Sequence, residues 1–594
     1  MRLNFQHSFM SLLLLTNVVF LFGFTGKKTV LLPRPHSSNT ANLLIGWYDM
    51  VHQCKKEKDV AKNYWVASIS PTYMRSFGNN FLSEFLFGRE AFKVQGSRVE
   101  GRSRQSLFAD YFGLPSDFNG TLSINPVIDT FLMDINFYWA LNQWAKGLYF
   151  RIQLPIGSTN WDLGLLEKVR STGNLGFPAG YMGKEFIPTS DLPASLESVM
   201  DSREVPVRFG DMQDPIRFGR VIAYHARVHF SNIVFAFGYD FMCDDHKQLS
   251  ASLDIVIPSG TRSSAERLFA PVIGNDNHTE LGVDITGHYK FWDNNESNSF
   301  AGVYSKMQLH HLFKAEVIKS YDFNSGLGSR YMLLERVYRS PNANVFEEGP
   351  NQTFIPIPYQ YGGSLVSAIN HTTLKTETSF AVQVDWSIMG VYHQNDNGFD
   401  LNIGYNAWYR SSEKIHKRDA FISNEFAIKG DAQIYGFLEN SNDPYRLAVS
   451  QSEATIFAGQ GAGNFSSEST LYTNSNADNP SRVFAKDSAN KEAPLQSISI
   501  SDASRSEAPF GAQNFTHTSN KIQLLSDSDI NTSSALMPKS FTQKLFLNIG
   551  GAWLDHEHEP FVGFGGDIEW RMGSVENNAA YSKWSIWVKG GFVH

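Results

Sequence analysis

The sequence predicts an all-β fold, a closed antiparallel transmembrane β-barrel with long extracellular loops. Three observations support this prediction. Aromatic residues make up 14% of the 594 residues and charged residues only 19%, whereas a soluble domain usually carries about 25% charged residues. Apolar and polar residues alternate over many segments of roughly 9–13 residues, long enough to cross a bilayer as tilted strands. After the first 26 residues, no apolar run approaches the roughly 20 residues that a membrane helix requires.

The charge balance and the cysteine content exclude several classes of protein. A formal net charge of −8 does not fit a polybasic nucleic-acid binder, so we expect no nucleic-acid partner. The hydrophobic content of 42% can bury a large core, which excludes disorder of the whole chain. Cys54 and Cys243 are too few for a disulfide framework or a Cys-rich zinc site. Whether these two cysteines pair with each other is left open.

The N-terminus predicts export. Arg2 precedes the uncharged stretch Ser8–Gly26, and a positive start followed by an apolar run is typical of a signal peptide. We therefore interpret residues 1–26 as a signal peptide without assigning the cleaved bond. The stretch is also nearly long enough for a retained membrane anchor, so that alternative stays open. In either case the remaining chain leaves the cytoplasm, with residues 27–61 expected as a periplasmic N-terminal segment.

The alternation is clearest in residues 399–410. Phe399, Leu401 and Ile403 share one face, whereas Asp400 and Asn402 share the other, because successive side chains of a strand point to opposite sides. The same pattern recurs in residues 131–139, 148–156, 222–230, 233–241, 249–257, 281–291, 301–309, 380–392, 426–436, 545–553, 561–572 and 584–594.

If these strands lie in a membrane, as their length and alternation predict, the sheet must be closed. Hydrocarbon offers no water to an unpaired strand edge, so a sheet in a membrane must close on itself. Tryptophan and tyrosine near strand ends, such as Trp139 and Trp584, are typical of the aromatic girdles at the level of the lipid headgroups. The strands of a soluble sandwich or barrel alternate too, so a secreted soluble β protein remains an alternative.

The barrel is expected to occupy residues 62–594 and to contain about 16 strands, within a range of about 14–18, around an aqueous channel. Residues 63–129 and 307–376 do not alternate cleanly, and we expect them to supply the few strands still missing. Whether residues 307–376 form a plug is left open. Residues 438–540 are rich in Ser, Asn, Asp and Ala and predict a long surface loop within the barrel domain.

The candidate site residues are charged side chains on the polar faces, which would line the lumen and influence ion selectivity. They are Arg151, Arg227, Asp385, Arg410, Asp431, Glu569, Arg571 and Lys589. The sequence indicates no catalytic residues, no metal ligands and no cofactor-binding motif such as a phosphate-binding loop. We therefore expect neither a cofactor nor an enzymatic activity.

The export signal, the alternating segments and the C-terminal YSKWSIWVKGGFVH together resemble bacterial outer-membrane β-barrel proteins of the porin or major-outer-membrane-protein type. Members of that group end in an aromatic residue that follows apolar residues at alternate positions, and the barrel-insertion machinery reads this ending. Ile586, Val588 and Phe592 keep the alternation, whereas Gly590 interrupts it and His594 stands last. The resemblance implies a cell outer-membrane location, with lipid and the insertion machinery as partners; homo-oligomerisation is left open.

These observations predict a porin-like channel for passive diffusion of small hydrophilic solutes, including ion transport. Two further alternatives remain. One is a barrel that displays surface loops for adhesion, and the other is a structural outer-membrane barrel without an open channel.

Overall fold

The computed structural model describes Lys28 and residues 30–46, 63–177, 180–201, 206–437, 444–446, 455–457 and 524–594, with short gaps inside the longer ranges. The signal-peptide prediction for residues 1–26 and most of the surface-loop prediction for residues 438–540 lie outside the described residues. So does Cys54, and with it the question of a pair with Cys243. No helix among the described residues is long and apolar enough to cross a membrane.

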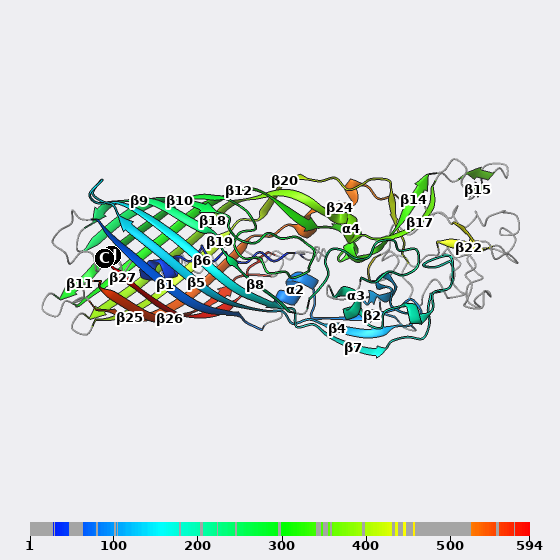
Figure 1. The fold of residues 1–594 in the computed structure, drawn as a ribbon, viewed down its shortest axis with the longest axis horizontal. Coiled ribbons are helices and arrows are strands. Elements are labelled where there is room, and N and C mark those ends of the chain that lie inside the picture. Colours follow the sequence, from blue (N-terminus) through cyan, green and yellow to red (C-terminus); the bar gives the residue numbers. More distant parts are fainter. Residues whose placement is uncertain are drawn as a thin grey trace, which may run out of the picture.

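Twelve strands close into one antiparallel barrel (Figure 1). In pairing order they are β1 (Tyr64–Ser76), β5 (Val127–Ala140), β6 (Leu148–Asp162), β9 (Ile233–Cys243), β10 (Lys247–Ile257), β11 (Glu280–Asn294), β12 (Ser299–Ser320), β18 (Thr373–Gln394), β19 (Phe399–Arg410), β25 (Ser540–Ala552), β26 (Pro560–Arg571) and β27 (Lys583–Val593). The last strand pairs with the first, from Val66 opposite Val593 to Ser76 opposite Lys583. The sheet therefore has no open edge around this circuit.

The alternation places apolar side chains on the outside of the barrel. On β27, Ile586, Val588 and Phe592 are exposed, whereas Ser585 and Lys589 on the opposite face are buried. The same outward apolar face is formed on the other strands by residues such as Leu253, Val283, Leu309, Ile403, Leu547 and Phe564. A continuous apolar band around a closed barrel is the exterior of a transmembrane barrel, as the sequence predicts.

The predicted count of 16 strands is wrong, because several alternating segments do not cross the membrane. Residues 222–230 form β8 (Tyr224–Phe230), which pairs only with the far half of β6. In residues 426–436, β21 (Phe426–Ile428) pairs with β14 (Leu333–Arg339) beyond the barrel. Residues 307–376 add no barrel strand of their own, because they contain the long ends of β12 and β18 and the connection between them. Alternation with period two predicts a strand with one apolar and one polar face. It does not predict whether the apolar face contacts lipid or protein.

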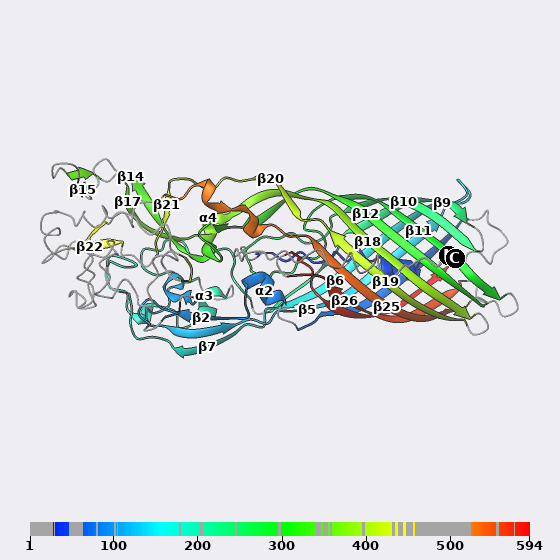
Figure 2. The same cartoon turned by 180° about the vertical axis from the view of Figure 1, so that it is seen from behind.

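The connections between strands divide into two kinds. At the end that holds the C-terminus, strands are joined by the short segments 141–147, 244–246, 295–298, 395–398 and 553–559. At the other end lie the connections 77–126, 163–232, 258–279, 321–372, 411–539 and 572–582, all but the last of which are much longer. Figure 2 shows these long connections gathered beyond one end of the barrel. We call their described part the extramembrane domain.

The extramembrane domain contains small sheets and short helices. Its elements are α2 (Phe81–Phe87), β2 (Ala91–Gln95), β3 (Leu107–Phe108), β4 (Asn119–Ser123), β7 (Leu166–Ser171), α3 (Leu196–Met200), β13 (Asp322–Phe323), β14, β15 (Phe346–Glu348), β16 (Phe354–Pro356), β17 (Tyr359–Ser367), α4 (Ile369–Thr372), β20 (Glu413–Arg418), β21, β22 (Tyr435–Phe437), β23 (Pro444–Arg446) and β24 (Ile530–Asn531). Phe108, Tyr111 and Phe177 are fully buried here within one apolar cluster. The same cluster includes Ile128, Trp161, Leu312 and Phe380 at the ends of barrel strands, so the hydrophobic core of the domain is continuous with the adjoining end of the barrel.

Candidate functional site in the barrel lumen

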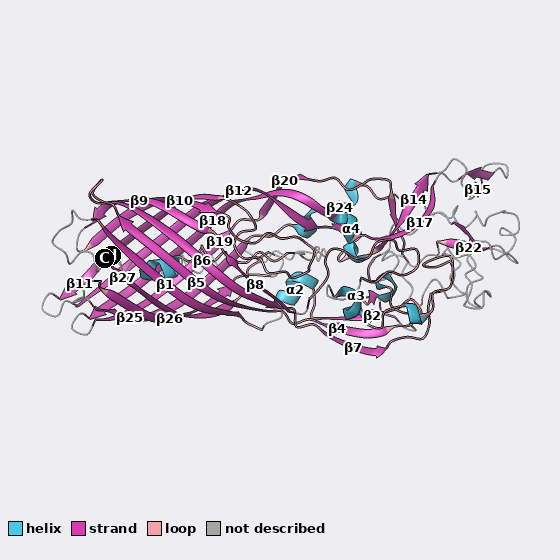
Figure 3. Ribbon diagram, in the orientation of Figure 1, coloured by secondary structure: helices cyan, strands magenta, loops and turns pink. Residues whose placement is uncertain are grey.

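The N-terminal segment runs from the extramembrane domain, where Lys28 donates its backbone N–H to Phe85, into the barrel, and we call Lys28 and residues 30–46 the plug. Its last residues, 40–46, form a short helix, visible in cyan within the barrel in Figure 3. Leu44 and Ile45 pack there against Tyr304, Met389 and other buried wall residues. The expectation of a periplasmic segment over residues 27–61 is therefore wrong for the described residues. Residues 33–40 of the plug, PRPHSSNT, carry many polar atoms. Hydrogen bonds between these atoms and the polar wall of the lumen hold the plug inside the barrel.

Arg34 joins the plug to three strands of the wall, β18, β19 and β26. Its guanidinium donates to the Asp385 carboxylate at 2.6 Å and to Glu569 Oε1 at 3.2 Å, and also to Asn406 Oδ1 at 2.9 Å. All of these side chains are almost completely buried. Such charge-assisted hydrogen bonds are about twice as strong as neutral ones, so Arg34 is the strongest polar attachment of the plug.

The Asp385 carboxylate is shared between Arg34 and the start of the plug helix. Thr40 Oγ1 donates to Asp385 Oδ1 at 2.6 Å, and Ser38 Oγ donates to Oδ2 at 2.9 Å. The Thr40 backbone N–H donates to the same carboxylate at 3.2 Å. Asp385 therefore fixes both the position of Arg34 and the direction of the helix that follows.

Two cationic wall residues hold the plug by its backbone. Arg410 donates to the carbonyl oxygens of Leu32 at 2.7 Å and Pro33 at 3.3 Å. Lys589 Nζ donates to the carbonyl oxygen of Asn42 at 3.0 Å. Because these contacts involve main-chain oxygens, they fix the path of the plug without requiring particular plug side chains.

Elsewhere the wall charges neutralise one another. Arg151 contacts Asp284 at 3.2 Å and Asp254 at 3.5 Å. Lys306 pairs with Asp284, and His310 Nδ1 lies 2.8 Å from Glu280. These side chains are buried, so the described lumen is a packed, ion-paired interior and the expected open aqueous channel is not what this structure contains.

The eight candidate residues fall into three groups. Arg151, Asp385, Arg410, Glu569 and Lys589 lie in the lumen as just described. Arg227 lies on β8 and donates to the Pro271 carbonyl oxygen at 3.3 Å, and Arg571 ends β26 with its guanidinium over the Phe81 ring at 4.1 Å. Asp431 lies outside the described residues. A role in ion selectivity stays a prediction for all eight.

Sequence reasoning missed Arg34 and several of the wall charges. Asp254, Asp284 and Lys306 stand on the polar faces of segments whose alternation was recognised, so the same criterion could have selected them. Arg34 had no such signal, because it lies in a Pro-containing stretch without periodicity. Only the return of the chain into the barrel gives Arg34 its partners.

The described residues contain no group of three or more His, Cys, Asp or Glu side chains that could hold a metal ion. The lumen instead combines paired charges with neutral hydrogen-bonding groups. This arrangement can bind a plug and, without the plug, present fixed charges of both signs to water and solutes.

Comparisons with known proteins give likenesses at low similarity. No protein-family model matches the chain, and no curated protein matches it. A solved COG4313 outer membrane channel from Pseudomonas putida F1 shares 7% identity over 91% of this chain and 99% of its own, with a TM-score of 0.31. A Pseudomonas aeruginosa FadL homologue shares 5% identity over 89% of both chains, with a TM-score of 0.25. A TodX monoaromatic hydrocarbon channel mutant shares 8% identity over 89% of both chains, also with a TM-score of 0.25.

Proposed function

We propose that the chain is an outer-membrane channel that its own N-terminal segment holds closed and that conducts small hydrophilic solutes when the plug withdraws. Residues 1–26 would direct export, and their removal would leave the plug as the free N-terminal end of the chain. The protein would act without chemistry on the solute.

The observation that carries the proposal is the position of Arg34 between Asp385 and Glu569. A buried carboxylate is stable only with a partner or in contact with water. When Arg34 leaves, Asp385 loses its cationic partner, whereas Glu569 keeps Lys544 and Lys583 at 3.6 Å. Withdrawal of the plug would therefore be accompanied by entry of water at Asp385. An apolar plug in an apolar lumen would leave a void instead. The polar contact between plug and wall thus favours a reversible closure.

Planar-bilayer recording on refolded protein tests this proposal. The wild-type chain should give small or rare conductance steps, whereas deletion of residues 30–46 should give larger and more frequent steps. Arg34→Ala should fall between these two. Arg217→Ala is the matched control, because Arg217 forms an exposed ion pair with Asp214 at 2.6 Å in the extramembrane domain; it should behave like the wild type. A deletion variant that inserts without conductance steps would exclude a channel.

A second candidate function rests on the extramembrane domain. A barrel needs only turns to join its strands, whereas this domain contains a large buried apolar cluster, and this additional structure favours a surface display or adhesion role. The test is attachment of cells that carry the barrel with and without residues 438–523. Unchanged attachment in a strain that exposes the protein would count against this role.

A further inference from the structure

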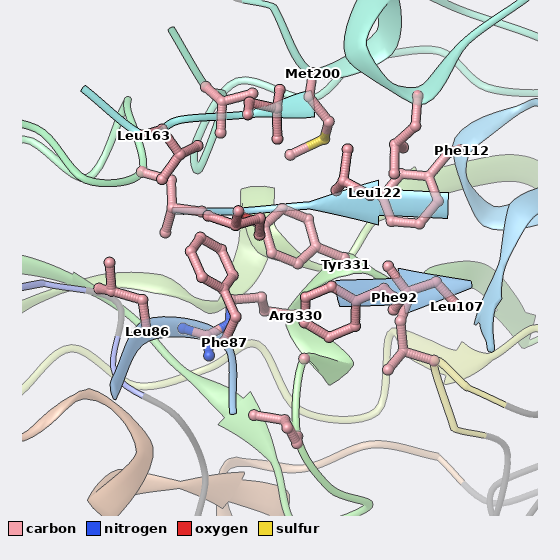
Figure 4. Close-up of a pocket in the computed structure, with 18 of the residues that line it drawn as sticks. Leu86, Phe87, Phe92, Leu107, Phe112, Leu122, Leu163, Met200, Arg330 and Tyr331 are labelled. Carbon is pink, nitrogen blue, oxygen red and sulfur yellow. The ribbon is translucent and has the colours of Figure 1, made fainter. Parts of the chain in front are cut away.

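An apolar cavity lies in the extramembrane domain, next to the first described residue of the plug. Its volume is about 120 Å³. Side chains from α2, β2, β3, β4 and α3 converge on it (Figure 4). The apolar residues of this wall include Leu86, Phe87, Phe92, Leu107, Leu122 and Met200. A concave apolar wall with a few polar groups is the usual form of a small-molecule site.

The polar groups in the wall are few. The hydroxyl group of Tyr331 donates to the carbonyl oxygen of Gly219 at 2.8 Å, and Arg330 pairs with Asp322 at 2.8 Å. Glu197 is exposed. The fourth polar residue of the lining is Lys28, the start of the plug.

Lys28 has only a neutral acceptor. Its ammonium group donates to the Ser533 carbonyl oxygen at 2.6 Å, and the described residues place no carboxylate within ion-pair distance of it. The nearby Lys319 is neutralised by Glu413 at 2.9 Å. Burial and then the charge of Lys319 lower the pKa of Lys28 to about 8. The carboxylates of Glu413 and Asp322 oppose this lowering of the pKa, but neither forms an ion pair with Lys28, so the ammonium group has no charged partner in direct contact within the described part of the chain.

We propose that this cavity binds an apolar molecule carrying one anionic group, with the apolar part against the cavity wall and the anionic group at Lys28. A carboxylate there would replace a neutral acceptor by a charged one, which strengthens the hydrogen bond. The apolar part would leave water for a wall of leucine, phenylalanine and methionine side chains.

The cavity is connected to the lumen through the plug chain. The Lys28 backbone N–H donates to the Phe85 carbonyl oxygen at 3.3 Å, and Leu31 and Leu32 pack in the same apolar cluster as Phe85. The next residues along the chain lead to Arg34 in the lumen. A ligand at Lys28 therefore binds to the same segment that closes the barrel, and its effect on closure, unlike the binding itself, rests on the proposed function.

Equilibrium dialysis of the full chain in lipid nanodiscs, with octanoate and 1-octanol as probes and empty nanodiscs as the blank, tests the binding. The wild type should bind octanoate saturably with one site per chain. Lys28→Met should weaken octanoate binding by at least about tenfold and leave octanol binding unchanged, whereas Lys28→Arg should restore octanoate binding. The matched control is Lys168→Met, an exposed lysine on β7, which should bind as the wild type does.

Leu122→Trp should fill the cavity and remove binding of both probes. A heat-modifiability gel identifies any variant whose barrel is not folded. Equal octanoate binding by the wild type and Lys28→Met would overturn the proposal, and so would uptake that does not saturate. These outcomes are independent of conductance, so failure of the ligand site and failure of the channel can be distinguished.

Discussion

The interior of the barrel and the interior of the extramembrane domain are both closed to water, but different side chains fill them. The lumen buries Asp385, Glu569 and Arg410, whereas the domain buries Phe108 and Tyr111. The difference follows from what lies outside each region. Lipid takes the apolar face of every barrel strand, so the polar face is left to form the interior. Water surrounds the domain, so apolar side chains turn inward. Burial of a position therefore does not by itself predict whether the side chain there is polar or apolar.

The largest expected effect is in the lumen, where removal of one charge leaves several partners unmatched. Glu569 contacts Arg34 at 3.2 Å and both Lys544 and Lys583 at 3.6 Å. Glu569→Ala should lower the free energy of unfolding of the barrel by about 3–5 kcal/mol, because a buried charge without its partner is strongly unfavourable. Urea unfolding in detergent, followed by the heat-modifiability gel, measures this change.

The control for that prediction is an ion pair exposed to water. Glu316 lies 3.5 Å from Lys375, with both side chains largely exposed, and Glu316→Ala should change the free energy of unfolding by less than about 1 kcal/mol. Equal effects of the two substitutions would mean that the lumen is hydrated rather than packed.

The second prediction compares two apolar truncations. Phe108 is 0% exposed and its ring lies 4.9 Å from that of Tyr111. Phe108→Ala should destabilise the extramembrane domain by about 3–5 kcal/mol, since it leaves a cavity. Leu547 is 44% exposed on the barrel exterior, where lipid chains can fill the space that a truncation leaves. Leu547→Ala should therefore stay within about 0.5 kcal/mol.

Limited proteolysis of the domain and urea unfolding of the barrel report the two effects separately. Phe108→Ala should expose the domain to protease while the barrel keeps its gel shift. If Leu547→Ala destabilises the barrel as strongly as Phe108→Ala destabilises the domain, the exterior face of β25 is packed against protein rather than lipid.

The smallest expected effect concerns a carboxyl group in the apolar domain. Asp110 is buried and accepts hydrogen bonds from the Ser97 backbone N–H at 2.9 Å and the Tyr181 hydroxyl at 2.7 Å. Burial raises the pKa of Asp110 from 3.8 to about 6. The folded domain thus binds this proton more tightly than the unfolded chain does. The associated stability is present below pH 4 and is lost as the pH rises to about 6, by on the order of 2–3 kcal/mol.

Protease protection of the domain between pH 4 and pH 7 measures this loss. Asp110→Asn should flatten the dependence, whereas Asp191→Asn, at an exposed site, should leave it in place. A wild-type domain that becomes more stable between pH 4 and pH 6 would contradict the assignment to Asp110.

The sequence predicted the barrel because its evidence is local. Residues 399–410 lie as their alternation predicts, with Asp400, Asn402 and Arg410 buried and Phe399 and Ile403 exposed. The strand count could not be predicted in the same way. Tyr224–Phe230 alternates as well, and only its pairing with the far half of β6 places it beyond the circuit of the barrel.

By itself, then, the sequence determined that strands of membrane-spanning length would have one apolar and one polar face, since side-chain direction is a property of adjacent residues. The tertiary structure alone decided that the polar faces enclose the plug. Arg34 and Asp385 are 351 residues apart in the chain, and no local pattern links a Pro-containing N-terminal stretch to a carboxylate on β18. Their contact depends on closure of the whole sheet and on the return of the chain into its interior.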